Sequence, residues 1–136
     1  MKLLSLVVLS TVSLTSLEPT WTFERHGLSA FLQEPDMQEP PVRLACGRPG
    51  YLEIDIVSGH KEEVTLIGAN NIALTLRGER SAPGRIISKV YFKSMTAEFF
   101  RDEGDVEVVG DRPYRLHLKG ARGVLQILES SCTAVS

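Results

Sequence analysis

A period-two alternation of apolar and polar residues, beginning after Cys46, is the feature that most constrains the fold. In the first run, Leu52, Ile54 and Ile56 are separated by acidic residues. Successive side chains of a β-strand point to opposite faces, so such a run buries one face and exposes the other. The same alternation recurs at 64–66, 72–76, 90–92, 97–99, 106–108, 114–118 and 125–127.

The segments between these runs contain the residues that tight chain reversals need. They are rich in Gly, Asn, Asp and Pro, and lie at 58–61, 68–71, 78–84, 102–105, 110–113 and 120–123. Such residues favour β-turns, and no stretch of a dozen residues keeps a helical spacing. We therefore predict an all-β fold, a small antiparallel sandwich or barrel of about eight strands, with an irregular N-terminal arm.

The chain has two cysteines, Cys46 and Cys132, one at each end of the predicted strand block. In an exported protein, two such cysteines are expected to form a disulfide. Closing a loop of this length stabilises a fold by about 4 to 5 kcal/mol on the chain-entropy model. We therefore predict a structural bridge that closes the domain.

The N-terminus indicates export. Met1 and Lys2 precede an uncharged stretch over residues 3–17, which is typical of a secretory signal peptide. A membrane-spanning helix needs about 20 mainly apolar residues, and this stretch is shorter and contains several Ser and Thr. We expect a secreted, extracellular protein without a membrane span.

Composition divides the rest of the chain into three segments. Residues 18–45 carry four prolines and five acidic residues against two arginines, which indicates an arm or linker. Residues 46–132 form the disulfide-closed β domain, and 133–136 a C-terminal tail. The arm also holds Trp21 and Phe23. Either it packs on the domain, or it is an exposed motif that binds a partner.

Motifs for a metal site, a phosphate loop or a cofactor are not found, so we predict neither metal nor cofactor. One catalytic hypothesis remains, built on His60, Glu79, Arg85 and His117. These are residue types that a metal-free ribonuclease uses to transfer protons and to neutralise a phosphodiester.

Two resemblances to known families give alternative functions. Residues 83–85 and 117–132 resemble small fungal guanyl-specific ribonucleases, which also tie the N-terminal part of the domain to its C-terminus by a disulfide. The helix that follows the first half-cystine in those enzymes has no counterpart here, because a predicted strand follows Cys46. Residues 81–84 and Arg101 resemble the inhibitory pair of periplasmic lysozyme inhibitors, small disulfide-closed barrels, although the spacing here is longer. These resemblances imply a ribonuclease-like hydrolase or an inhibitor barrel.

We predict a secreted, monomeric, non-catalytic protein that binds a protein partner, as a microbial effector in virulence or an inhibitor does. This inference rests on the class of protein, because small exported single-domain proteins without a cofactor motif are often effectors or inhibitors. A net charge of −2 argues against nucleic acid as a partner. Exposed Trp, Tyr and Arg carry most binding energy in protein interfaces. The candidate binding residues are Trp21 and Phe23 in the arm, and Arg77, Arg80, Arg85 and Tyr91 in the turn region.

Overall fold

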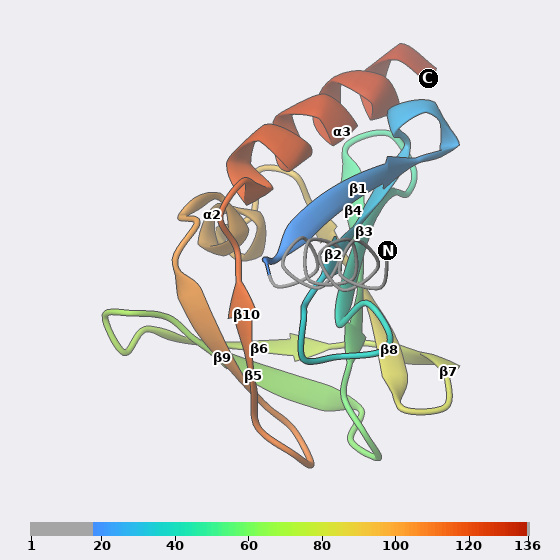
Figure 1. Ribbon diagram of the computed structural model, residues 1–136. Coiled ribbons are helices and arrows are strands. Elements are labelled where there is room, and N and C mark those ends of the chain that lie inside the picture. Colours follow the sequence, from blue (N-terminus) through green and yellow to red (C-terminus); the bar gives the residue numbers. More distant parts are fainter. Residues whose placement is uncertain (1–17, 136) are drawn as a thin grey trace, which may run out of the picture.

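A computed structural model describes residues 18–135 and contains two antiparallel sheets, as predicted (Figure 1). The predicted signal peptide, residues 1–17, lies outside the described residues, as does Ser136. The six-stranded sheet has the order β1 (Thr20–Glu24), β2 (Ser29–Gln33), β3 (Val42–Cys46), β4 (Tyr51–Val57), β8 (Arg85–Tyr91) and β7 (Glu79–Ala82). The four-stranded sheet has the order β10 (Tyr114–His117), β9 (Asp105–Val109), β5 (Glu63–Ile67) and β6 (Ala73–Arg77). A short 3₁₀ turn, η1 (Arg25–Gly27), and two helices, α2 (Met95–Arg101) and α3 (Ala121–Val135), complete the fold.

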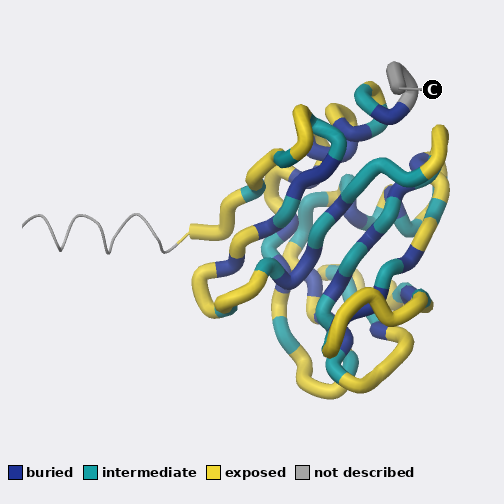
Figure 2. Tube along the Cα trace, turned by 90° about the vertical axis from the view of Figure 1, so that its right-hand side faces the viewer, coloured by how far each residue is buried: buried dark blue, intermediate teal, exposed yellow. Residues whose placement is uncertain are grey.

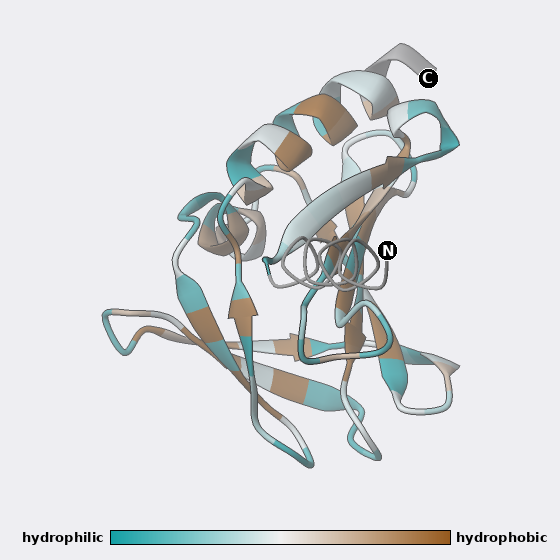
Figure 3. Ribbon diagram, viewed as in Figure 1, coloured by the Kyte–Doolittle hydropathy of each residue, from teal (hydrophilic) through white to brown (hydrophobic). Residues whose placement is uncertain are grey.

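The alternating strands bury most of the residues that the sequence predicts to face inward. Ile72 does not, because it lies before β6 and is 61% exposed. In β4, the side chains of Leu52, Ile54 and Ile56 are 0% exposed. Buried positions alternate with more exposed ones along the strands (Figure 2), and hydropathy alternates in the same way along β5 and β9 (Figure 3). The buried residues of both sheets and both helices form one core cluster, which is the main hydrophobic stabilisation of the fold.

Two of the predicted strands are helices. Residues 97–99 lie in α2, where the Ser94 side chain accepts a hydrogen bond from the backbone N–H of Ala97 and caps the first turn. Residues 125–127 lie in α3, and Ile127, predicted to face inward, is 46% exposed. The buried residues of α3 are instead spaced three to four apart, at 121, 124, 125, 128 and 132. That spacing places them on one helical face.

The predicted N-terminal arm contributes strands to the six-stranded sheet. Residues 20–24 and 29–33 form β1 and β2, which pair with each other in the register Trp21 to Leu32. The proline-containing segment 34–41 is a loop that hydrogen bonds fix to the rest of the chain. The backbone N–H of Val57 donates to the Pro41 carbonyl, and Arg85 donates to that of Pro40. The arm therefore packs on the domain.

Cys46 and Cys132 form the predicted disulfide, with their Cα atoms 5.5 Å apart. The bridge joins the end of β3 to α3, which also contacts α2 and η1. It therefore fastens the last helix to the six-stranded sheet (Figure 1). α3 continues beyond Cys132, so part of the predicted tail is helical. Within residues 18–135, no helix is long and apolar enough to cross a membrane.

Candidate functional site

Two of the four candidate catalytic residues have structural partners in different parts of the molecule. The Arg85 side chain is 10% exposed and forms an ion pair with Asp55 at 2.7 Å. The Nδ1 atom of His117 lies 2.9 Å from the buried carboxylate of Glu34, which also accepts the His117 backbone N–H at 2.8 Å. Arg85 thus links β8 to β4, and His117 links β10 to the β2–β3 loop.

The other two, His60 and Glu79, lie near Arg80, which holds a loop. The Arg80 guanidinium donates to the carbonyl oxygens of Gly59, His60 and Lys61 at 2.9 to 3.1 Å. Glu79, its neighbour on β7, is exposed. Arg85 and His117 are thus held by Asp55 and Glu34, and among the described residues no hydrogen bond or ion pair joins any two of the four candidates.

Arg101, one half of the pair that resembles a lysozyme inhibitor, is also committed to the fold. Its side chain is 16% exposed and pairs with Glu98 at 2.8 Å and with Glu129 at 3.7 Å. It also donates to the Phe92 carbonyl at 2.8 Å. These contacts join α2 to α3 and to the end of β8, which leaves the guanidinium little freedom to enter another protein's cleft.

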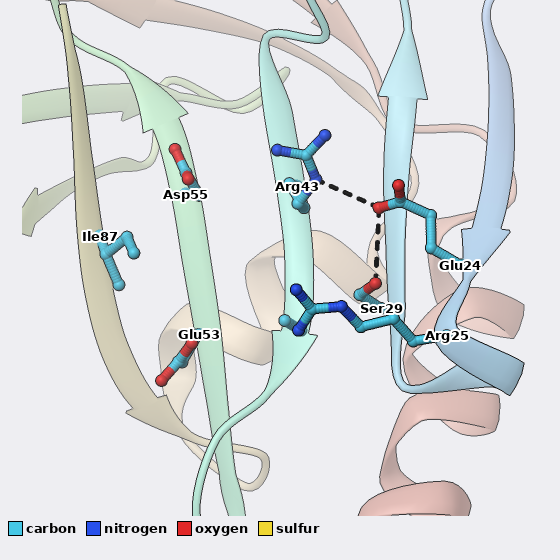
Figure 4. A pocket seen from close by; sticks show the side chains of 8 residues that line it. Glu24, Arg25, Ser29, Arg43, Glu53, Asp55 and Ile87 are labelled. Carbon is cyan, nitrogen blue, oxygen red and sulfur yellow. Dashed lines mark hydrogen bonds and ion pairs between the residues drawn. The ribbon is translucent and has the colours of Figure 1, made fainter. Parts of the chain in front are cut away.

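A charged groove of about 370 Å³ crosses the outer face of the six-stranded sheet (Figure 4). Arg43 pairs with Glu24 at 3.2 Å, and the Ser29 hydroxyl donates to the same carboxylate at 3.4 Å. Asp55 is held by Arg85, as described above. The side chain of Arg25 extends across β2 toward β3 (Figure 4). Acidic and basic groups alternate here and largely neutralise one another, so the groove has no strong preference for either charge.

Among the candidate binding residues, Trp21 packs against the core, and its indole nitrogen is buried. Phe23, on the same strand, is 40% exposed. The Arg77 side chain is 82% exposed and pairs with Glu63 at 2.8 Å. Of the six candidates, Tyr91 is the one that is exposed and belongs to a cluster of aromatic and cationic side chains. We therefore take this cluster as the candidate binding site.

This site is an aromatic patch composed of Arg48, Tyr51 and Tyr91, with Met95 four residues beyond Tyr91 in the sequence. Tyr51 and Tyr91 are paired at the ends of β4 and β8, with ring centroids 4.4 Å apart and hydroxyls 2.7 Å apart. The Arg48 guanidinium lies 4.9 Å from the centre of the Tyr51 ring. Tyr51 is half-buried, Tyr91 is 59% exposed, and Met95, at the start of α2, is 82% exposed. Large apolar side chains at this exposure are typical of binding surfaces.

Backbone hydrogen bonds hold the two loops that carry the patch. The Phe92 N–H donates to the Gly50 carbonyl at 3.0 Å, and the Ser94 N–H donates to that of Tyr91 at 3.0 Å. The hydrogen bond between the tyrosine hydroxyls, together with their charge repulsion on ionisation, raises the pKa of Tyr91. The Tyr91 phenol is therefore neutral at physiological pH, and its hydrogen bond to Tyr51 preorganises the patch.

The sequence identifies Tyr91 as a candidate but misses its neighbours. Tyr51 occupies an outward position at the start of an alternating run, and Met95 lies in a segment predicted as a loop before a strand. Their proximity depends on the pairing of β4 with β8, which are separated by 27 residues that include three other strands. Period-two alternation predicts that each strand exists, but not which strand is its neighbour.

The whole chain was compared with protein families, with curated proteins and with solved structures. No protein family model, curated protein or solved structure matches it.

Proposed function

We propose that this chain is a secreted, non-catalytic protein that binds a protein partner through the aromatic patch, in the manner of an effector or an inhibitor. The observation that carries the proposal is the exposed Tyr51–Tyr91 pair, with Arg48 against one ring. Tyr, Arg and Met are enriched at protein interfaces, and Tyr and Arg are frequent hot spots. The disulfide supports an oxidising, extracellular location.

The ordering of the patch favours tight recognition. A tyrosine loses little side-chain entropy on binding, and here each ring is already positioned by the other. Lys89 and Lys93 flank Tyr91 at alternate positions and are exposed. Together with Arg48 they give the rim a positive charge, although Glu53 lies opposite Lys89 in the strand register. The fitting partner is a protein surface with an apolar centre and an acidic rim.

Photo-crosslinking tests the proposal. A photoreactive amino acid replaces Met95, and the purified protein is irradiated with extracts of candidate target cells. We expect one dominant adduct. The same replacement at Ile127, which is exposed on α3, serves as the matched control and gives no adduct. Equal adducts from both positions, or none from Met95, contradict the proposal.

A turnover assay separates binding from the hydrolase alternative. Purified protein is incubated with total RNA and, in parallel, with a lysozyme-type polysaccharide. We expect degradation at background level, because among the described residues no hydrogen bond or ion pair joins any two of the four candidate catalytic residues. Turnover of RNA that a folded His117→Ala variant lacks would replace the binding proposal by the ribonuclease alternative.

A further inference from the structure

A cavity of about 560 Å³ lies away from the aromatic patch, between the end of β4 and the β9–β10 loop. Its walls come from residues 57–60, residues 110–114 and Met37 of the β2–β3 loop. This volume is within the range of about 300 to 1,000 Å³ that is typical of small-molecule sites.

Hydrogen bonds tie the walls to each other. The Tyr114 hydroxyl donates to the Val57 carbonyl at 2.7 Å, and the Asp111 carboxylate accepts the His60 backbone N–H at 2.5 Å. Glycine allows the two loops to approach: a Cβ on Gly59 would come within 2.6 Å of Asp111. The cavity is thus part of the folded framework.

The interior of the cavity is apolar. Its wall is mainly apolar and includes Met37, Val57, Pro113 and the Tyr114 ring. Burial raises the pKa of the Tyr114 hydroxyl, which therefore stays neutral. An aliphatic or aromatic group gains about 25 cal/mol for each Å² of apolar surface that it buries against such a wall.

One cation in the cavity wall lacks a partner within the described part of the chain. Arg112 is exposed, and its guanidinium makes no ion pair or hydrogen bond with the residues described. The Asp111 carboxylate, the acidic group in the wall, accepts the His60 N–H and is held against the neighbouring loop. The Ser58 hydroxyl is buried and has essentially no surface exposed toward the cavity. The group left for a ligand is therefore a guanidinium, which prefers an anionic acceptor.

We propose that this cavity binds a small carboxylic acid with an apolar body. The body occupies the apolar interior, and the carboxylate accepts hydrogen bonds from the Arg112 guanidinium. Carboxylates only accept hydrogen bonds, and those from a guanidinium are among the stronger ones. This site is independent of the protein-binding patch, so either can fail without the other.

Titration with octanoate tests the proposal, with octanamide and octylammonium as neutral and cationic comparators of the same body. Binding is followed by amide chemical shifts of the ¹⁵N-labelled full chain. We expect saturable shifts confined to residues 57–60 and 110–114, and octanoate binding at least fivefold more tightly than octanamide. Equal affinity for all three ligands, or no saturable shift in this region, would overturn the proposal.

Two variants test the assigned cation. Arg112→Gln is expected to weaken octanoate binding at least fivefold and to leave octanamide unchanged, whereas Arg122→Gln on α3 changes neither. Unchanged octanoate affinity in Arg112→Gln would contradict the assignment.

Discussion

Replacing Arg85 by Met removes a side chain that the fold uses at three points. The guanidinium donates to the Asp55 carboxylate at 2.7 Å, to the Pro40 carbonyl at 2.8 Å and to the Asp55 carbonyl at 3.4 Å. The two charged side chains are 10% and 19% exposed. Removing one partner of a buried ion pair costs about 3 to 5 kcal/mol, because the other charge stays buried. We expect a loss of about 3 kcal/mol in the free energy of unfolding, since Asp55 regains some water.

Equilibrium urea unfolding of the oxidised protein at pH 7 measures this loss. With a slope of about 2 kcal/mol per molar urea, the midpoint moves down by about 1.5 M. Arg77→Met is the matched control, because Arg77 and Glu63 are 82% and 50% exposed and such pairs contribute about 0 to 1 kcal/mol. Asp55→Leu on the Arg85→Met background should recover part of the loss. A change below about 1 kcal/mol in Arg85→Met would refute a structural role and return Arg85 to the candidate binding residues.

Three further predictions concern the disulfide, the strand faces and the cavity wall. Cys132→Ala is expected to lower the free energy of unfolding by about 2 to 5 kcal/mol; a stability equal to that of the wild type would show that the bridge adds nothing. Leu116→Asp should prevent folding because Leu116 is 0% exposed, whereas Arg115→Asp should be tolerated; circular dichroism that is the same for both would contradict the alternation. Tyr114→Phe should cost about 1 kcal/mol at pH 7 through the lost bond to Val57. Burial raises the pKa of Tyr114 in the folded protein, so the stabilisation by the neutral phenol is lost as the pH rises above about 10, where the unfolded chain ionises. The difference in free energy of unfolding between the wild type and Tyr114→Phe should therefore shrink above this pH. A difference that stays constant with pH would contradict this prediction.

Alternation predicted the strands whose two faces have different surroundings. One face is buried in each of the strands β4, β5, β6, β9 and β10. In these strands the alternation of apolar and polar residues therefore follows the alternation of buried and exposed positions. The disulfide was predictable for a different reason, because an exported chain with two cysteines has one pairing available.

The helices could have been found from other signals in the same residues. Ser94 followed by Ala97 and Phe100 combines a capping residue with a three-residue spacing. In α3, Val124, Leu125 and Leu128 fit a helical face, but Leu125 and Ile127 alone also fit a strand. Two apolar residues two positions apart do not distinguish the two-residue period of a strand from the 3.6-residue period of a helix. A longer stretch of sequence is needed to tell them apart.

The N-terminal strands were missed because prolines dominate the segment that follows them. Proline excludes helix and central strand locally, yet three of the four prolines lie in the β2–β3 loop and Pro19 precedes β1, so β1 and β2 are intact. The contacts that hold this loop, Glu34 with His117 and Arg85 with the Pro40 carbonyl, join residues far apart in sequence. The aromatic patch depends on the same kind of non-local pairing, which one sequence does not record.

The contribution of the Tyr51–Tyr91 pair to binding is measured by the dissociation constant of the complex with the partner captured at Met95, compared among single-alanine variants. We expect this pair to supply most of the binding energy. Tyr91→Ala and Tyr51→Ala are each expected to weaken binding by at least about 30-fold, which corresponds to about 2 kcal/mol, with unchanged stability of the free protein. Arg115→Ala, at an exposed position on β10 of the other sheet, should bind like the wild type. Tyrosine variants that bind within about threefold of the wild type would contradict a role of the pair in binding.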